Sequence, residues 1–167
     1  MNIQRPKVSV CIPTFNGARY LGAAIESVLG QTLWDLELVI VDNRSQDETA
    51  TLVRRYLELD ARVRYHAYSD HVDIFSNFNR GFDHAAGAYI KFLCADDVLL
   101  PTQLEKQAAI LESHPQVGLV ACAKDIVDAS GARLRSVRPF DADLVMNGRE
   151  AIRLTLECCW NFIGESL

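Results

Sequence analysis

The sequence predicts an α/β fold in which a mostly parallel sheet is flanked by helices on both faces. Short apolar runs alternate with amphipathic stretches of helical period, which is the pattern of successive βαβ units. Several of these runs are apolar at nearly every position, as expected for strands that are covered on both faces. The chain has 167 residues, so we expect a single domain-sized core.

Five apolar runs are predicted to be strands because polar or glycine-containing segments bound each of them. They lie at residues 7–12, 37–41, 63–67, 89–94 and 117–123. The helix after the first strand is predicted between Gly17 and Gly30, with Leu21, Ala24, Ile25, Val28 and Leu29 on its buried face. Ser45 and Glu48 have the spacing of a capping box, which predicts the start of a second helix.

A third helix is predicted from the spacing of Phe75, Phe78 and Phe82, which places all three rings on one buried face. Gly87 is expected to end this helix in a left-handed conformation. A fourth helix is expected after Pro101. Its start is predicted from the capping-box spacing of Thr102 and Glu105, and its inward side chains are Leu104, Ala108 and Leu111.

The pattern weakens beyond Lys124. Residues 128–131 (DASG) predict a hairpin turn, and residues 133–146 are interpreted as a flexible connection. A last helix is predicted to begin at Asn147, with Ile152 and Leu156 facing inward.

Composition argues against several classes of protein. The net charge of −5 disfavours sequence-independent binding to nucleic acid, and no apolar stretch has the length of a transmembrane segment. Three of the five cysteines lie in apolar strand-like runs, so we expect reduced thiols, and the lack of CxxC or paired Cys/His spacing argues against a zinc site. These features favour a cytoplasmic protein, with peripheral association at the inner face of the membrane as a further expectation.

The segment AYIKFLCADDVLLP contains the most informative feature, an apolar strand that ends in Asp96 and Asp97. Neighbouring carboxylates repel each other, and a divalent cation between them and an anionic ligand relieves that repulsion. The alternative is that the two residues only open a turn. We interpret the pair as a metal and diphosphate site because other polar clusters are predicted to lie beside it.

These clusters follow the first, second and fourth strands. In a sheet of strand order 3-2-1-4 with right-handed crossovers, the carboxyl ends of these strands meet at one crevice, where ligands bind. The crevice would contain an aromatic ring, amides and carboxylates, which together suit a nucleoside diphosphate. The residues concerned are Pro13, Thr14, Phe15 and Asn16, then Asp42 and Asn43, and finally Asp96 and Asp97.

The glycine-rich motifs that usually bind phosphate are absent. The segment PTFNG follows the first strand in place of GxGxxG, and there is no Walker lysine motif. A diphosphate would therefore depend on a cation for neutralisation, and Mg²⁺ or Mn²⁺ suits oxygen ligands.

The chain resembles family 2 glycosyltransferases of the Rossmann-like GT-A fold. The resemblance rests on three blocks in the same order, VSVCIPTFNGARYLGAAIESVLGQTL, ELVIVDNRSQDET and NFNRGFDHAAGAYIKFLCADDVLLP. It implies nucleoside contacts from Pro13, Thr14, Phe15, Asn16, Asp42 and Asn43, a position near the ribose for Asp96, and metal ligation by Asp97. Arg80 could reach a phosphate, although an exposed polar helix face explains it equally well.

The resemblance further implies metal-dependent, inverting transfer of a sugar from a nucleoside diphosphate to a hydroxyl of a glycan or lipid-linked acceptor. UDP or dTDP is expected in preference to GDP, although Asn43 replaces the aspartate that often reads uracil. Residues 1–130 would form the nucleotide-sugar-binding core, and residues 131–167 would begin the acceptor-side region. The chain resembles the N-terminal portion of such an enzyme, with the catalytic base expected beyond Leu167, so we expect it to bind nucleotide but transfer sugar poorly.

Two alternatives remain open at this stage. A non-catalytic nucleotide-sugar-binding module would have the same cavity without transfer. A nucleotidyltransferase would need a glycine-rich basic loop after the first strand, which PTFNGARY does not supply.

Overall fold

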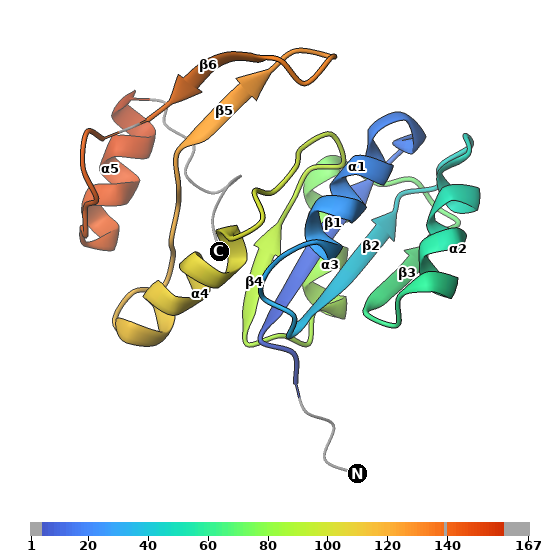
Figure 1. Cartoon of the computed structure of the whole chain (residues 1–167), viewed down its shortest axis with the longest axis horizontal. Coiled ribbons are helices and arrows are strands. Elements are labelled where there is room, and N and C mark those ends of the chain that lie inside the picture. Colours follow the sequence, from blue (N-terminus) through green and yellow to red (C-terminus); the bar gives the residue numbers. More distant parts are fainter. Residues whose placement is uncertain (1–4, 139, 159–167) are drawn as a thin grey trace.

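A computed structural model describes residues 5–138 and 140–158 (Figure 1). Residues 159–167, which include Cys159 and the C-terminal segment WNFIGESL, lie outside the described residues. The elements are, in order, β1 (Val8–Thr14), α1 (Ala18–Leu29), β2 (Leu36–Asp42), α2 (Thr49–Leu59), β3 (Val63–Ala67), α3 (Ile74–His84), β4 (Tyr89–Phe92), α4 (Gln103–Ser113), β5 (Lys124–Val127), β6 (Arg133–Val137) and α5 (Gly148–Cys158).

The main sheet has four parallel strands in the order β3-β2-β1-β4, which confirms the predicted strand order. β1 therefore lies between β2 and β4, and its last residue, Thr14, stands opposite Asp42 at the end of β2. The carboxyl ends of the strands meet at one edge of the sheet. The loops that follow β1, β2 and β4 are thereby brought together there.

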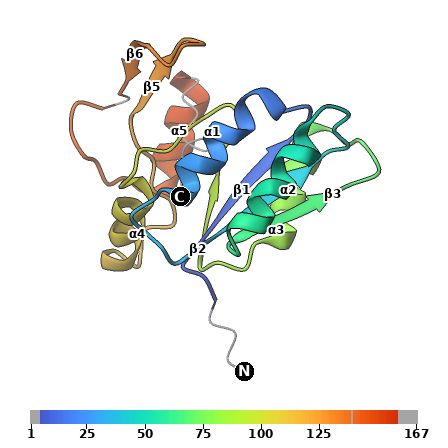
Figure 2. The ribbon, with the colours of Figure 1, turned by 45° about the vertical axis from the view of Figure 1, so that its right-hand side comes forward.

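Helices cover both faces of this sheet (Figures 1 and 2). Because side chains alternate along a strand, Val8, Val10 and Ile12 of β1 point to the face that α1, α2 and α4 cover. Cys11 points to the opposite face, where it packs with Val39 and Val41 beneath α3. The predicted α/β architecture with two covered faces is confirmed.

α3 approaches the sheet with a different face from the one predicted. Phe75 and Phe82 are largely exposed, and the buried residues are Asn77 and Gly81. A Cβ added at Gly81 would lie 3.1 Å from the Phe92 ring and 3.3 Å from the Cβ of Cys11, so the small residue permits close contact with β1 and β4. The prediction that the phenylalanines form the buried face was therefore wrong, apart from Phe78, which packs on Phe92.

Gly87 does not have the left-handed conformation that was predicted, because Gly131 is the only described glycine with positive φ. Its lack of a side chain serves another purpose. A Cβ at Gly87 would lie 2.5 Å from the backbone nitrogen of Ser9. The glycine thus allows the chain entering β4 to pass directly beside β1.

Both predicted capping boxes are absent, because neither Glu48 nor Thr102, the residues that precede α2 and α4, makes a side-chain cap hydrogen bond. Ser45 accepts a hydrogen bond from the backbone of Asn16 instead, and Glu105 accepts one from the Thr32 hydroxyl. Contacts with distant segments therefore replace the local caps.

The C-terminal part differs from the prediction in three places. Residues 117–123 do not form a strand, and residues 133–137 form β6 of a separate hairpin where a flexible connection was expected. Ile152 and Leu156 of α5 are exposed although they were expected to face inward. The predicted turn at residues 128–131 is confirmed, with Asp128 accepting hydrogen bonds from two backbone N–H groups beyond it. No helix in the described ranges combines the length and the apolar character needed to cross a bilayer.

Candidate functional site

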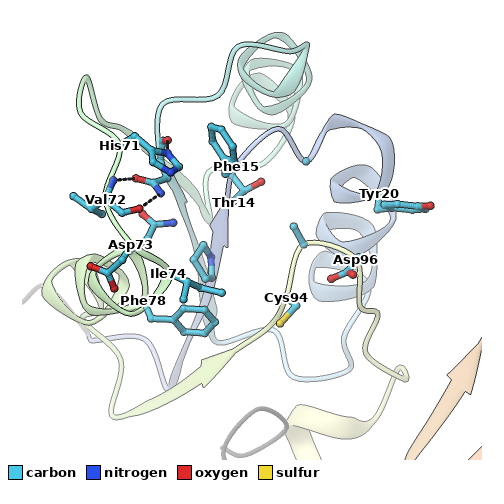
Figure 3. A pocket seen from close by; sticks show the side chains of 15 residues that line it. Thr14, Phe15, Tyr20, His71, Val72, Asp73, Ile74, Phe78, Cys94 and Asp96 are labelled. Atoms are coloured by element: carbon cyan, nitrogen blue, oxygen red, sulfur yellow. Dashed lines mark hydrogen bonds between the residues drawn. The ribbon is translucent and has the colours of Figure 1, made fainter.

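A cavity of about 470 Å³ lies at the carboxyl ends of the parallel strands (Figure 3). The loops after β1, β2, β3 and β4 contribute to its walls, together with the first turns of α1 and α3. The lining residues are Pro13, Thr14, Phe15, Gly17, Tyr20, Asn43, His71, Val72, Asp73, Ile74, Asn77, Phe78, Cys94, Ala95 and Asp96.

Five of the nine predicted site residues line this cavity, and four do not. Those in the lining are Pro13, Thr14, Phe15, Asn43 and Asp96. Those outside it are Asn16, Asp42, Arg80 and Asp97. Convergence of the loops is therefore confirmed, whereas the ligand contacts predicted for individual residues stay predictions.

Asn16 joins the loop after β1 to the loop after β2. Its φ of +51° lies in the left-handed region, which asparagine tolerates better than most residues. Its backbone N–H donates to Ser45 Oγ, and its side-chain oxygen accepts from the backbone N–H of Gln46, both at 2.8 Å. The residue therefore holds the two loops in register.

The amino terminus of α1 is closed to anions. The backbone N–H of Gly17 donates to Thr49 Oγ1, and that of Ala18 donates to the Asp47 carboxylate, each at 3.0 Å. Such N–H groups would otherwise be the usual phosphate cradle of a nucleotide-binding βα loop. Their use within the protein, together with the negative charge of Asp47, supports the inference from sequence that no glycine cradle binds phosphate here.

Asp42 is buried and bonded within the protein. Its carboxylate accepts a hydrogen bond from the backbone N–H of Ser45 at 2.8 Å and another from the Tyr65 hydroxyl. Burial and this bond to Asp42 raise the pKa of Tyr65 above its usual value. Asp42 therefore organises the loop after β2, and the cavity wall itself is formed by the next residue, Asn43.

The side chain of Asn43 pairs with the backbone of Val72 (dashed lines in Figure 3). Its own backbone N–H donates to the Thr14 carbonyl at 2.9 Å, which extends the contact between β1 and β2 beyond the strands. The Asn43 carbonyl lies 3.1 Å from Nδ1 of His71, and the His71 ring lies 4.5 Å from that of Phe15. One polar residue thus fixes the aromatic side of the cavity.

Arg80 lies outside the cavity lining and bonds to the Asn43 side chain. Its guanidinium donates to Asp70 at 2.6 Å and to Asn43 Oδ1 at 3.3 Å, and it lies over the Tyr68 ring. These contacts fix the loop between β3 and α3. They occur on the side of the cavity formed by residues 71–73, which Figure 3 shows opposite Cys94 and Asp96.

Three possible metal ligands lie together on that opposite side. One ligand atom each from Cys94, Asp96 and Asp97 can be chosen so that all three lie within 4.8 Å of one another. Both carboxylates are exposed, so their charges are accessible to a cation and to an anionic ligand. The two carboxylates suit Mg²⁺ or Mn²⁺, which prefer oxygen ligands, whereas the thiol is a softer donor that neither ion needs.

The loop after β3 was missed in the sequence analysis. His71, Val72 and Asp73 belong to this loop, and they line the cavity. The signal was present, because a polar segment follows a strand that the predicted order places in the same sheet. Asn77 was not among the predicted site residues either, although it is buried in the cavity wall.

A parallel sheet with a ligand-sized cavity at the carboxyl ends of its strands defines a Rossmann-like α/β protein, in which that edge of the sheet is the usual place for a ligand. The family model described as glycosyl transferase family 2 matches residues 9–162. The chain belongs to this family of glycosyltransferases.

Related proteins support this assignment. The chain is 33% identical over 139 residues to an uncharacterised glycosyltransferase of Rickettsia prowazekii, covering 83% of this chain and 42% of that protein. It is 30% identical over 139 residues to an uncharacterised glycosyltransferase of Methanocaldococcus jannaschii, covering 82% of this chain and 48% of that protein. The chain thus spans less than half the length of these two relatives.

Solved structures show the same GT-A fold. A crystal structure of residues 1–349 of TarS from S. aureus superposes with a TM-score of 0.64 at 24% identity, over 69% of this chain and 34% of that one. The mannosyltransferase PcManGT from Pyrobaculum calidifontis, in complex with GDP-Man and Mn²⁺, superposes with a TM-score of 0.63 at 27% identity, over 72% and 36%. The predicted GT-A fold is confirmed.

Proposed function

We propose that this protein takes part in metal-dependent, inverting transfer of a sugar from a nucleoside diphosphate to an acceptor hydroxyl. The observation that carries the proposal is the distribution of charge in the cavity. Among the described residues, no lysine or arginine lines it, whereas Asp96 does, with Asp97 and Cys94 beside it. A diphosphate in such a cavity needs a bound cation to offset the carboxylate charge.

The two sides of the cavity suit the two ends of a nucleoside diphosphate. Phe15 and His71 offer aromatic rings on one side, where a base can stack. The cluster of Cys94, Asp96 and Asp97 lies on the other side, so Asp97 and Asp96 would hold the cation next to the diphosphate. PcManGT, which binds GDP-Man with Mn²⁺, supports this arrangement for a protein of the same fold.

In the proposed reaction, the acceptor oxygen bonds to the anomeric carbon as the bond from that carbon to the diphosphate oxygen breaks. The acceptor proton passes to a general base, and the nucleoside diphosphate leaves. A bound Mn²⁺ or Mg²⁺ supplies electrostatic stabilisation of the charge that develops on the leaving diphosphate. The described residues contribute donor binding through the aromatic rings and the carboxylate cluster.

The proposal extends to the organisation and setting of the enzyme. Residues 1–130 would bind the donor, and residues 131–167 would begin the acceptor side. The acceptor would be a glycan or a lipid-linked saccharide. We place the reaction in the cytoplasm, as the composition of the sequence predicts.

The test is a thermal-shift panel of UDP, dTDP, GDP and CDP, each with and without Mn²⁺. We expect at least one nucleotide to raise the melting temperature only when Mn²⁺ is present, and Asp97→Asn to abolish that rise. Asp83→Asn is the matched control, since it makes the same charge change at an exposed position outside the cavity lining. Equal stabilisation without Mn²⁺, or in Asp97→Asn, would contradict the metal-dependent proposal.

A further inference from the structure

Two oxygen atoms in the wall of the cavity are buried and have no hydrogen-bond partner within the described chain. They are Oγ1 of Thr14 and Oδ1 of Asn77, whose residues are 3% and 4% exposed. Buried polar atoms in folded proteins are nearly always hydrogen-bonded, because an unpaired one loses its bonds to water without replacement. Both atoms belong to residues that line one cavity, so a ligand in that cavity could supply their missing partners.

The orientation of the Asn77 amide is set by β2. Its Nδ2 donates to the carbonyl of Val41 at 3.5 Å, which leaves Oδ1 as the remaining polar atom. With the amide reversed, Asn77 Oδ1 would face the Val41 carbonyl oxygen, and two acceptors would lie against each other. Asn77 therefore presents an acceptor, to which a ligand would contribute the hydrogen-bond donor.

The position of α3 makes this orientation rigid. Asp73 caps the helix by accepting from the backbone N–H groups of Phe75 and Ser76. One turn beyond Asn77, Gly81 contacts Cys11, whose Sγ donates to the Gly81 carbonyl at 3.4 Å. The helix is thus capped before Asn77 and fixed to the sheet after it.

Thr14 is equally fixed. It is the last residue of β1, and its carbonyl accepts from the backbone N–H of Asn43 at 2.9 Å. A Cβ on Gly17 would lie 2.3 Å from Thr14 Oγ1, so the hydroxyl occupies the space that a side chain at residue 17 would need, and the glycine is what permits this position. Oγ1 can both donate and accept, and it has no partner in the protein.

The side-chain amide of Asn43, which also lines the cavity, already has hydrogen-bond partners within the protein. Both ends of the Asn43 side chain are bonded to the Val72 backbone, so Asn43 has little capacity left to read a ligand. The family position that often reads the base therefore has a structural task in this chain. Recognition then depends on other polar atoms in the cavity wall.

We propose that Asn77 Oδ1 is a further recognition atom for the nucleoside part of the donor, which contributes a base N–H or a ribose hydroxyl to it, beside Thr14 Oγ1, a nucleoside contact that the family resemblance already implies. This inference rests on the proposed function, because it assumes a nucleoside diphosphate in the cavity. It assigns donor specificity to α3 and to the last residue of β1.

The test compares Thr14→Val and Asn77→Leu, which remove the two oxygens with little change of shape, with the unmodified chain. Dissociation constants are measured for UDP, dTDP, GDP and CDP with Mn²⁺, and melting temperatures are measured without ligand. We expect each variant to weaken the binding of the preferred nucleotide about three- to tenfold, as for one lost hydrogen bond. Without ligand, each should melt about 2–4 °C higher, since an unpaired buried oxygen is gone.

Gln107 provides a matched control. Its Nε2 donates to the Val120 carbonyl and its Oε1 is buried without a partner, as in Asn77, but it lies in α4 and does not line the cavity. We expect Gln107→Met to raise the melting temperature while leaving every dissociation constant unchanged. Thr14→Ser, which retains the hydroxyl, should keep the affinity of the unmodified chain.

Ligand analogues identify the donor group. N3-methyl-UDP lacks the imide N–H, and 2′-deoxy-UDP lacks a ribose hydroxyl. The analogue that lacks the partner of Asn77 should bind the unmodified chain and Asn77→Leu with the same affinity. UDP should bind the unmodified chain more tightly than it binds Asn77→Leu. If GDP is the preferred nucleotide, GDP and N1-methyl-GDP replace UDP and its analogues in this comparison.

Three results separate failure of this inference from failure of the proposed function. If a nucleotide binds the unmodified chain and both variants equally, the inference is wrong and the proposed function stands. If the two variants melt at a higher temperature but bind the nucleotide with unchanged affinity, the inference is likewise wrong and the proposed function stands. If none of the four nucleotides binds the unmodified chain, the proposed function is wrong, and the inference fails with it.

Discussion

The side-chain amide of Asn43 pairs with the backbone of Val72 through two hydrogen bonds, from Nδ2 to the carbonyl at 2.8 Å and from the N–H to Oδ1 at 2.9 Å. The pair imitates the bonding between neighbouring strands, and it ties the loop after β2 to the loop after β3. It also explains how an asparagine is accommodated where the family often has an aspartate.

Asn43→Asp is expected to destabilise the protein and to weaken nucleotide binding. The new carboxylate oxygen would face the Val72 carbonyl without a proton to share, which costs about 1–3 kcal/mol of unfolding free energy. Urea unfolding and nucleotide titration would measure the two effects. Asn79→Asp, at an exposed position of α3 outside the cavity lining, makes the same charge change and should alter neither. Tighter UDP binding by Asn43→Asp would refute this account.

Phe15→Ala is expected to weaken nucleotide binding by about 1–3 kcal/mol, the contribution of a base stacked on an aromatic ring. Stability should change little, because the ring is 50% exposed. Phe75→Ala removes a ring that is 79% exposed and lies outside the cavity lining, so it serves as the control. Isothermal titration with UDP or GDP and Mn²⁺ measures the difference. Equal losses in both variants would show that Phe15 has no particular role in binding.

Tyr65 should make stability fall at alkaline pH. Burial and the bond to Asp42 raise its pKa in the folded protein, so above about pH 10 the unfolded chain loses this proton while the folded chain retains it. The contribution is complete below the unfolded pKa and decreases by up to about 1.4 kcal/mol per pH unit above it. Urea unfolding between about pH 8 and about pH 11 should show a shallower decline of the unfolding free energy with pH for Tyr65→Phe than for the unmodified protein. Parallel curves for the two proteins would exclude this effect.

Tyr65→Phe should also lower stability at neutral pH. The substitution removes one of two hydrogen bonds to the buried Asp42 carboxylate, which costs about 1–3 kcal/mol. Tyr56→Phe provides a comparison, since its hydroxyl donates to the exposed Glu26 and its loss should cost less.

Gly87→Ala is expected to destabilise the protein by about 2–3 kcal/mol, because the added methyl group would overlap the backbone of Ser9 and the carbonyl of Tyr89. Gly118→Ala is the control. No atom lies within 4 Å of its added Cβ, and the change should stay within about 0.5 kcal/mol. Thermal or urea unfolding distinguishes the two, and equal stability of both variants would rule out the proposed overlap.

The strand order and the meeting of the loops were predictable because they follow from local signals. Nearly continuous apolar runs predicted β1 and β2, and right-handed crossovers restricted their arrangement. The polar residues after each strand then had to lie at one edge of the sheet. Thr14, Phe15, Asn43 and Asp96 were assigned to the cavity on this basis alone.

The remaining errors concern choices that tertiary contacts decide. Helical spacing identifies a stripe of Phe75, Phe78 and Phe82. The distance between α3 and β1, however, depends on Gly81, and a glycine contributes nothing to a pattern of apolar side chains. Capping-box spacing at Ser45 likewise gives no warning that Asn16, distant in sequence, binds its hydroxyl. Hydrogen bonds across the fold prevailed over the local ones.

In the proposed recognition of the donor by Asn77, the contact between Gly81 and Cys11 would link donor choice to a residue outside the cavity lining. A larger residue at Gly81 would lift α3 away from β1, and Asn77 would move with it one turn along the same helix. Selection for another nucleotide could therefore act by adjusting how deeply a helix is seated, without replacing a single atom in the wall that surrounds the nucleotide.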